Sequence, residues 1–238
     1  MISGNRNRLL PAACIVLLLG AASLAQKAPD DCSWTSGSKL RPAVKLRTAA
    51  DGASYKNYND GRAITVAEWF AFTCGMDAQV PAQLPADKPV EGLETVRVTV
   101  RGYLLGARFE RADDHDLHVE LGASPEWPGD HVVLEMSAGA EYCAARRALW
   151  QLVRRDGCRG DQCILRRPVE VEVTGYVLLG SPQPGNTDYC HMKSTRGLRK
   201  GKFESQVRGL WRLQPVLAVK TVPAPKPRMH GKRSRRHA

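Results

Sequence analysis

The chain has 238 residues, a formal net charge of +11, seven cysteines and 43% hydrophobic residues. Two cations lie in the first 25 residues and seven in the last 19, so the body between residues 26 and 219 is close to neutral, at about +2. This distribution assigns the basicity to a C-terminal tail and argues against a basic binding face in the body.

A signal peptide is predicted over residues 1–25. Arg6 and Arg8 precede an apolar run at 12–22, and the small residues Ser23 and Ala25, three and one positions before the cut, match a cleavage site. The apolar run is too short to cross a bilayer comfortably. The sequence therefore predicts export to the periplasm or the extracellular space, with no transmembrane segment after signal cleavage.

Six cysteines remain after removal of the signal peptide, which would carry Cys14 away. An even number of cysteines in an exported chain favours disulfides. A zinc site is not favoured, since Cys158 and Cys163 form the only close pair. Spacing leaves the pairing open, and the preferred pairs are Cys32–Cys74, Cys143–Cys190 and Cys158–Cys163.

Residues 26–92 are predicted to form a loop-rich N-terminal arm that lies over the core. Turn sequences such as Asn59-Asp60-Gly61 and several prolines interrupt this segment. One short helix is expected, with Thr65 as its N-cap and Glu68 in a capping-box position, ending near Cys74.

Residues 93–219 show the alternation of apolar and polar residues that indicates strands. Five strands are predicted, near residues 95–101, 114–121, 131–136, 169–179 and 211–219. A helix is expected between the third and fourth strands, from Tyr142 to a stop at Asp156-Gly157. This order is that of an OB-fold, a five-stranded Greek-key barrel. A small open α+β sheet is the alternative.

Residues 220–238 form the basic tail, which is rich in proline and has almost nothing apolar to bury. The segment is predicted to be disordered. Its cations would allow a non-specific, salt-sensitive contact with polyanions.

The second predicted strand carries two chemistries on opposite faces. Leu117, Val119 and Leu121 share one face that can fill a core, whereas Asp116, His118 and Glu120 share the other. The third strand adds His131 and Glu135 to the polar side, which we place on the outside of the barrel. If the two strands are neighbours, Asp116 or His118 lies across from Glu135.

Four motifs resemble those of a group of exported, uncharacterised bacterial proteins. Asp114-His115-Asp116-Leu117-His118-Val119, after Phe109-Glu110, resembles the E-x-D-G-D-Y-H-L-V-L strand of that group. Val133-Leu134-Glu135 followed by Cys143, then Val173-Thr174-Gly175, and finally Arg212-Leu213-Gln214-Pro215-Val216 resemble its later motifs, of which the last is E-L-H-P-V. The resemblance implies export and this fold; Arg212 and Gln214 replace the glutamate and histidine of that terminal strand.

These residues leave several functions open. The candidate ligand-binding residues are Asp116, His118, Glu135 and Gln214. The leading hypothesis is an exported, disulfide-stabilised binding or interaction module for an unknown ligand. The alternative is a metal-dependent hydrolase, of phosphodiesterase or nuclease type, in which Asp116, His118 and Glu135 hold a divalent metal or act as general base. A structural role, in which Asp116 and His118 pair and fix the strand register, is the third interpretation.

Overall fold

The computed structural model describes most of the chain between residues 28 and 223. The described residues are 28–33, 41–46, 55–111, 114–127, 129–157, 160–180, 188–192, 198–200, 203–204 and 206–223. The predicted signal peptide and residues 224–238 of the predicted tail lie outside them.

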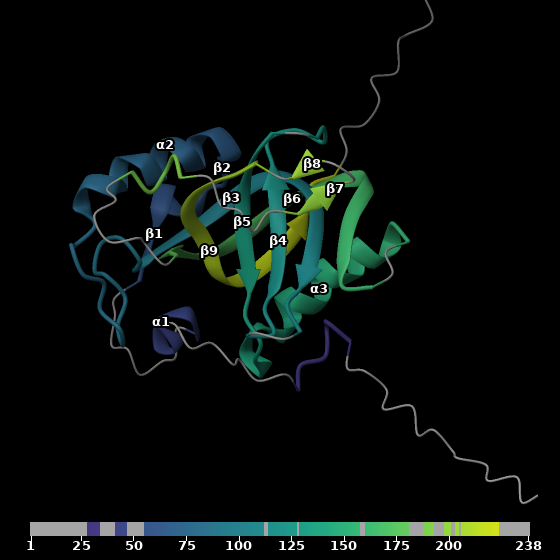
Figure 1. The fold of residues 1–238 in the computed structure, drawn as a ribbon, viewed down its shortest axis with the longest axis horizontal. Coiled ribbons are helices and arrows are strands. Elements are labelled where there is room, and N and C mark those ends of the chain that lie inside the picture. The colour runs from purple at the N-terminus through teal and green to yellow at the C-terminus, as the bar shows by residue number, and fades with distance from the viewer. Residues whose placement is uncertain are drawn as a thin grey trace, which may run out of the picture.

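Five long strands build the core of the fold. They are β3 (Val96–Phe109), β4 (Leu117–Gly122), β5 (Asp130–Met136), β6 (Gln162–Leu179) and β9 (Gln206–Thr221). They close into a barrel in the order β3–β4–β5–β9–β6 and back to β3 (Figure 1). The β5–β9 pair is parallel and the other pairs are antiparallel. This order confirms the predicted OB-fold-like Greek-key barrel.

Short elements surround the barrel. The helical ones are α1 (Pro42–Leu46), η2 (Tyr58–Gly61), α2 (Val66–Met76), η3 (Asp77–Gln79), η4 (Ala140–Tyr142) and α3 (Cys143–Arg155). The remaining strands are β1 (Lys56–Asn57), β2 (Ile64–Thr65), β7 (Arg199–Lys200) and β8 (Phe203–Glu204). Both β1 and β2 pair in parallel with β3, outside the barrel.

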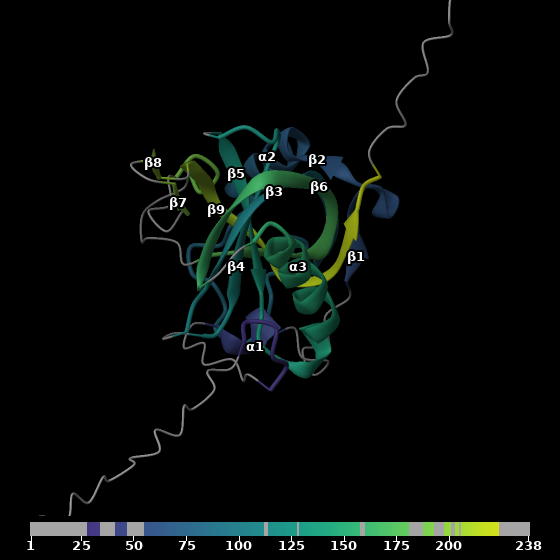
Figure 2. The ribbon, with the colours of Figure 1, turned by 90° about the vertical axis from the view of Figure 1, so that its right-hand side faces the viewer.

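The apolar alternates of the strands fill the barrel, as predicted. Leu117, Val119, Leu121 and Leu134 are all fully buried. The helix α3 follows β5, as expected, and lies across one end of the barrel (Figure 2), where Leu149 and Val153 join the core. Gly157, just after the end of α3, has a φ of 82°, which suits the predicted glycine stop.

The predicted capping box at the start of α2 is present. The Glu68 backbone N–H donates to the Thr65 hydroxyl at 3.2 Å, and the Thr65 backbone N–H donates to the Glu68 carboxylate at 2.6 Å. Two backbone N–H groups at the start of the helix, which have no partner within the helix, are thereby hydrogen-bonded. Trp69 and Phe70 then pack against the core cluster.

Three strands are longer than the alternation predicts. β3 continues beyond residue 101 to Phe109. β6 begins at Gln162 because its pairing with β3 resumes beyond a register shift, with Gly106 opposite Ile164. β9 continues to Thr221, which pairs with Val171 of β6. The predicted start of the tail at residue 220 is therefore two residues too early.

The disulfides correct two of the preferred cysteine pairs. Cys32 is bonded to Cys143 and Cys74 to Cys190, so the pairs Cys32–Cys74 and Cys143–Cys190 are wrong. The bonds join the arm to α3 and the end of α2 to the segment before β9, because the arm folds back along the barrel. Cys163 is also disulfide-bonded; its expected partner, residue 158, lies outside the described residues.

Two buried arginine contacts attach the arm to the barrel. Arg41 binds the buried Glu94 carboxylate with both terminal nitrogens, at 2.7 and 2.6 Å. Arg146 of α3 donates to the carbonyls of Pro29, Met136 and His115. These charge-assisted bonds attach the arm at Glu94, just before β3, and at α3.

Candidate functional site

The registers of β4, β5 and β9 place charged residues of the three strands side by side on the outer face of the barrel. His118 pairs with Glu135, and Glu120 pairs with Val133. Val133 in turn pairs with Arg212 of β9. Since directly opposed residues of neighbouring strands have their side chains about 5 Å apart, the candidate residues meet on one face, and the expected contact of His118 with Glu135 is confirmed.

His118 lies between two carboxylates. Its Nδ1 is 3.1 Å from Oε1 of Glu135 and its Nε2 is 3.4 Å from Oε1 of Glu120. Burial alone lowers the pKa of the imidazole, but the charge of Glu135 and the hydrogen bonds to both carboxylates outweigh it and raise the pKa to about 9. His118 is therefore an imidazolium at neutral pH.

Glu120 extends this cluster toward the β4–β5 hairpin. Its Oε2 is 2.8 Å from Nδ1 of His131, and its Oε1 accepts a 2.6 Å bond from the Leu198 backbone N–H. The Glu120 side chain is fully buried. Leu198 belongs to the segment between β6 and β9, so that segment covers part of the polar face.

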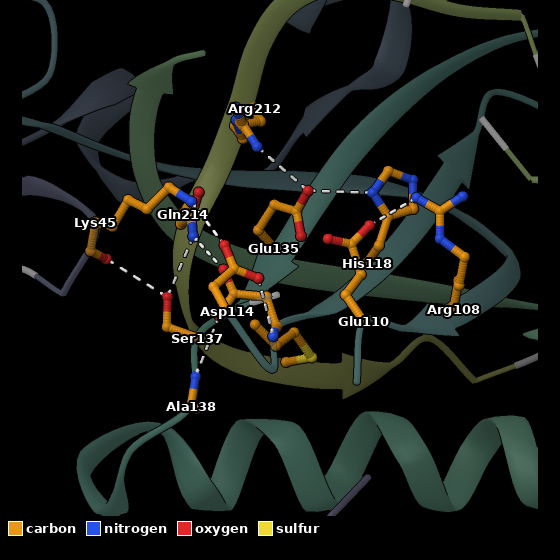
Figure 3. Close-up of polar contacts among 12 residues, drawn as sticks. Lys45, Arg108, Glu110, Asp114, His118, Glu135, Ser137, Ala138, Arg212 and Gln214 are labelled. Atoms are coloured by element: carbon orange, nitrogen blue, oxygen red, sulfur yellow. Dashed lines mark hydrogen bonds and ion pairs between the residues drawn. The ribbon is translucent and has the colours of Figure 1, made fainter. Parts of the chain in front are cut away.

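Glu135 is the centre of the cluster, between His118 and Arg212 (Figure 3). Its Oε1 is 3.3 Å from an Arg212 terminal nitrogen. Burial raises its pKa, but His118, Arg212 and Lys45 reverse this effect and lower the pKa to about 2. Its other oxygen, Oε2, is buried and has no hydrogen-bond partner among the described residues.

Asp116 and Gln214 form the second half of the site. The Gln214 amide nitrogen donates to Asp116 at 2.7 Å and to the Ser137 hydroxyl at 3.3 Å. Burial, followed by the charges of Glu135 and Asp114, raises the pKa of Asp116 well above its usual range. The Gln214 amide oxygen is buried and, within the described part of the chain, unpaired.

The arm supplies residues that the sequence reasoning missed. Lys45 of α1 forms a 2.8 Å ion pair with Asp114, and its carbonyl oxygen accepts a bond from Ser137 (Figure 3). Asp114 lies two residues before Asp116 in the sequence, so its position could have indicated that it belongs to the site. Lys45 offered none, because only the path of the arm brings it here.

The polar row lies outside the barrel, as predicted, but it is not on the surface. Asp116, His118, Glu120 and Glu135 are each at most 6% exposed. The most exposed side chain of the cluster is Arg212, at 24%. The arm and the segment before β9 cover these residues, through Lys45 and Leu198, so the outer face of the barrel is buried at this place.

The predicted metal ligands do not converge in this arrangement. Among the described residues, Asp116, His118 and Glu135 do not form a group of donor atoms within 4.8 Å of one another. Both nitrogens of His118 already bond to carboxylates, whereas a histidine that binds a metal needs a free lone pair. The metal site stays a prediction, and the geometry favours an ion-pair network.

Two other groups of donor atoms lie near the second disulfide. They are Cys74, Cys190 and His191, and Asp77, Asp188 and Cys190. The sulfurs are consumed by the Cys74–Cys190 bond. Asp77 accepts bonds from the Cys190 backbone N–H and the Trp211 indole, so it has a structural role.

No family model matches this sequence, and no match is found among curated proteins or solved structures. Within the described part of the chain, none of the helices has the length and apolar character that crossing a bilayer requires.

Proposed function

We propose that this protein is an exported binding module that holds a hydroxylated ligand on the outer face of its barrel, at Asp116, His118, Glu135 and Gln214. The observation that carries this proposal is the pair of buried acceptors, Glu135 Oε2 and Gln214 Oε1, without partners among the described residues. Buried polar atoms of folded proteins are nearly always paired. A ligand that presents hydrogen-bond donors would satisfy both.

The charges around the site favour a neutral donor over a cation. Glu135 is already influenced by the positive charges of His118, Arg212 and Lys45. A further cation would meet their repulsion, whereas a hydroxyl group donates a hydrogen bond without adding charge. OB-folds that bind oligosaccharides use this region of the barrel, so a carbohydrate is the ligand class that fits best.

The ligand would enter beside Arg212, the most exposed member of the cluster. The Lys45–Asp114 pair lies at the edge of the same cluster, with both side chains mostly buried. A ligand hydroxyl that reaches Gln214 would displace this edge contact. Because the arm partly closes the site, we expect the ligand to exchange slowly.

Titration of the ¹⁵N-labelled full chain by NMR tests this proposal. The probes are maltotriose, tri-N-acetylchitotriose and spermidine. We expect a sugar to shift the Gln214 side-chain amide and the Glu135 and Arg212 backbone signals, and Gln214→Met to abolish the shifts. The control Glu170→Gln changes an acceptor paired with Arg101 elsewhere and should leave them unchanged. Shifts with spermidine alone would contradict the choice of ligand class.

One observation favours the hydrolase alternative. The pKa of Asp116 is raised while that of Glu135 is lowered, and carboxyl groups with opposite shifts are typical of an acid and base pair. Calorimetric titration with Mg²⁺, Mn²⁺ and Zn²⁺ separates the two functions. Stoichiometric binding that is lost in His118→Ala would support a metal-dependent hydrolase.

Export rests on the predicted signal peptide and is supported by the disulfides, which persist in oxidising compartments. The resemblance to exported bacterial proteins points the same way. Contact of the basic tail with polyanions is a further part of this proposal. Detection of the oxidised chain, shortened by 25 residues, in the periplasm or the medium would support export.

A further inference from the structure

The exposed face of α3 carries arginines that the described structure leaves unpaired. Arg147, Gln151, Arg154 and Arg155 are exposed, at spacings that place the first three along one side of the helix. Arg147, Arg154 and Arg155 have no ion pair or hydrogen-bond partner for their side chains within the described residues. Arg154 and Arg155 also complement the helix dipole, but Arg147 lies too far from the C-terminus to do so.

The start of β6 extends this basic surface. Arg166 and Arg167 are exposed and lie in the segment that leaves the pairing with β3. The Arg166 backbone N–H donates to the Asp156 carboxylate, and Arg167 is 3.6 Å from the same group. Asp156 directly follows α3, so the two arginine pairs are neighbours across a pocket lined by Val153, Asp156, Ile164 and Arg166.

Arg154, Arg155, Arg166 and Arg167 thus face solvent near one mostly buried carboxylate, and Arg147 is exposed about two turns earlier on α3. The Asp156 side chain is 9% exposed and is already engaged by β6. The body as a whole is nearly neutral because carboxylates elsewhere in the chain balance the charge of these arginines. Exposed cationic side chains are therefore not confined to the tail.

We propose that this arginine surface, Arg147, Arg154, Arg155, Arg166 and Arg167, binds a linear polyol-phosphate chain, a polymer of phosphodiesters without bases. Guanidinium groups bind phosphates through two parallel hydrogen bonds, and every cation of this surface is an arginine. Arg147 and Arg154 are about 10 Å apart along the helix axis. A chain with repeating phosphates can contact both.

The neighbouring residues exclude two other anionic partners. An aromatic platform on which bases could stack is missing, since the side chains at the exposed positions of α3 are Ala144, Arg147, Gln151, Arg154 and Arg155. The apolar side of α3 is buried in the barrel core at Leu149 and Val153. It is therefore unavailable for insertion into a lipid surface.

The test measures binding of an abasic oligodeoxynucleotide, a pure phosphodiester chain, to the full protein at several salt concentrations. The variant R147Q/R154Q/R155Q removes three guanidinium groups. If each contacts one phosphate, the affinity at 0.1 M salt should fall on the order of 100-fold and the salt slope should flatten by about 2. The control K56Q/R62Q/K88Q removes the same charge from exposed positions of the arm. It should change the affinity and the salt slope much less.

Equal losses in the two variants would mean that net charge and the tail account for the binding, which overturns the proposal. An oligothymidylate of equal length should bind no more tightly than the abasic chain, and tighter binding would indicate nucleic-acid recognition instead. Vesicles of phosphatidylglycerol that outcompete the abasic chain would also overturn it. Unchanged thermal unfolding of both variants shows that the fold is intact.

Discussion

His118 and Glu135 are directly opposed across β4 and β5, with Nδ1 of the imidazole 3.1 Å from Oε1 of the carboxylate. A slip of one residue by either strand would turn its own member of this pair into the barrel. The pair therefore fixes the register of the strands and holds Glu135 in the candidate site. The same contact thus serves the fold and the proposed binding site, whereas the structural interpretation of the sequence expected His118 to pair with Asp116; its ring nitrogens bond to Glu135 and Glu120.

Replacement of Glu135 by glutamine should destabilise the protein by on the order of 3 kcal/mol, because it leaves a buried imidazolium with one carboxylate fewer. Urea denaturation monitored by circular dichroism measures this loss. Arg101 and Glu170 form a 2.8 Å pair that is much more exposed, so Glu170→Gln should cost less than about 1 kcal/mol. Equal losses would show that Glu135 has no special place in the fold.

Stability should depend on pH through His118. The pKa of His118 is about 9 in the folded protein against 6.5 as its ordinary value. A raised pKa stabilises the fold below pH 6.5, and this contribution is lost as the pH rises through 9; it is at most about 3 kcal/mol. Unfolding free energies at intervals from pH 6 to 10 should therefore fall, and the decline should be weaker in His118→Asn.

Leu134 and Val133 test the two faces of β5. Leu134 is fully buried inside the barrel, whereas Val133 lies on the outer face and is 8% exposed. Leu134→Ala should cost about 2–5 kcal/mol of unfolding free energy, and Val133→Ala clearly less. Similar costs would mean that the cover over the outer face is packed as tightly as the barrel interior.

Two truncations locate the end of the folded chain. A chain that ends at Pro223 should keep its melting temperature, since β9 and the bond from the Val222 backbone N–H to the Glu170 carbonyl are retained. A chain that ends at Val219 loses the pairing of Lys220 and Thr221 with β6 and should melt at a lower temperature. Differential scanning calorimetry compares the two chains.

Peptide mapping without reduction should recover Cys32 linked to Cys143 and Cys74 linked to Cys190. The serine variant of Cys32 should release the arm to protease while the barrel resists. Constraint of a loop this long typically stabilises a fold by about 2–4 kcal/mol. Recovery of free thiols at these positions would rule out the disulfide assignment.

The barrel was predictable from the sequence because its signals are local. The alternation of Leu117, Val119 and Leu121 with polar residues predicted the inward face of β4. From Tyr142 the apolar residues recur at helical spacing instead of alternating, which predicted α3. The cover over the polar face was not predictable, because it depends on where residues 41–46 and Leu198 lie in space. For the same reason the cysteine pairs were wrong: Cys32 follows the arm to α3.

One missed residue did carry a local signal. Arg146 of α3 is 1% exposed and binds three carbonyls. It lies three residues before Leu149 and seven before Val153, which is the spacing of the buried stripe. A charged residue is rarely buried without partners, but the planar guanidinium group with its several donors suits a buried junction of carbonyls.

The two described disulfides interleave along the chain, so the order in which cysteines emerge during synthesis or translocation differs from the order in which they are joined. Cys32 and Cys74 appear first, but each bonds to a cysteine more than a hundred residues later, at sequence separations of 111 and 116. A chain oxidised as it emerges would join the first two to each other and trap a misfolded product. Recombinant production should therefore depend on a disulfide isomerase, or on oxidation delayed until the barrel has closed.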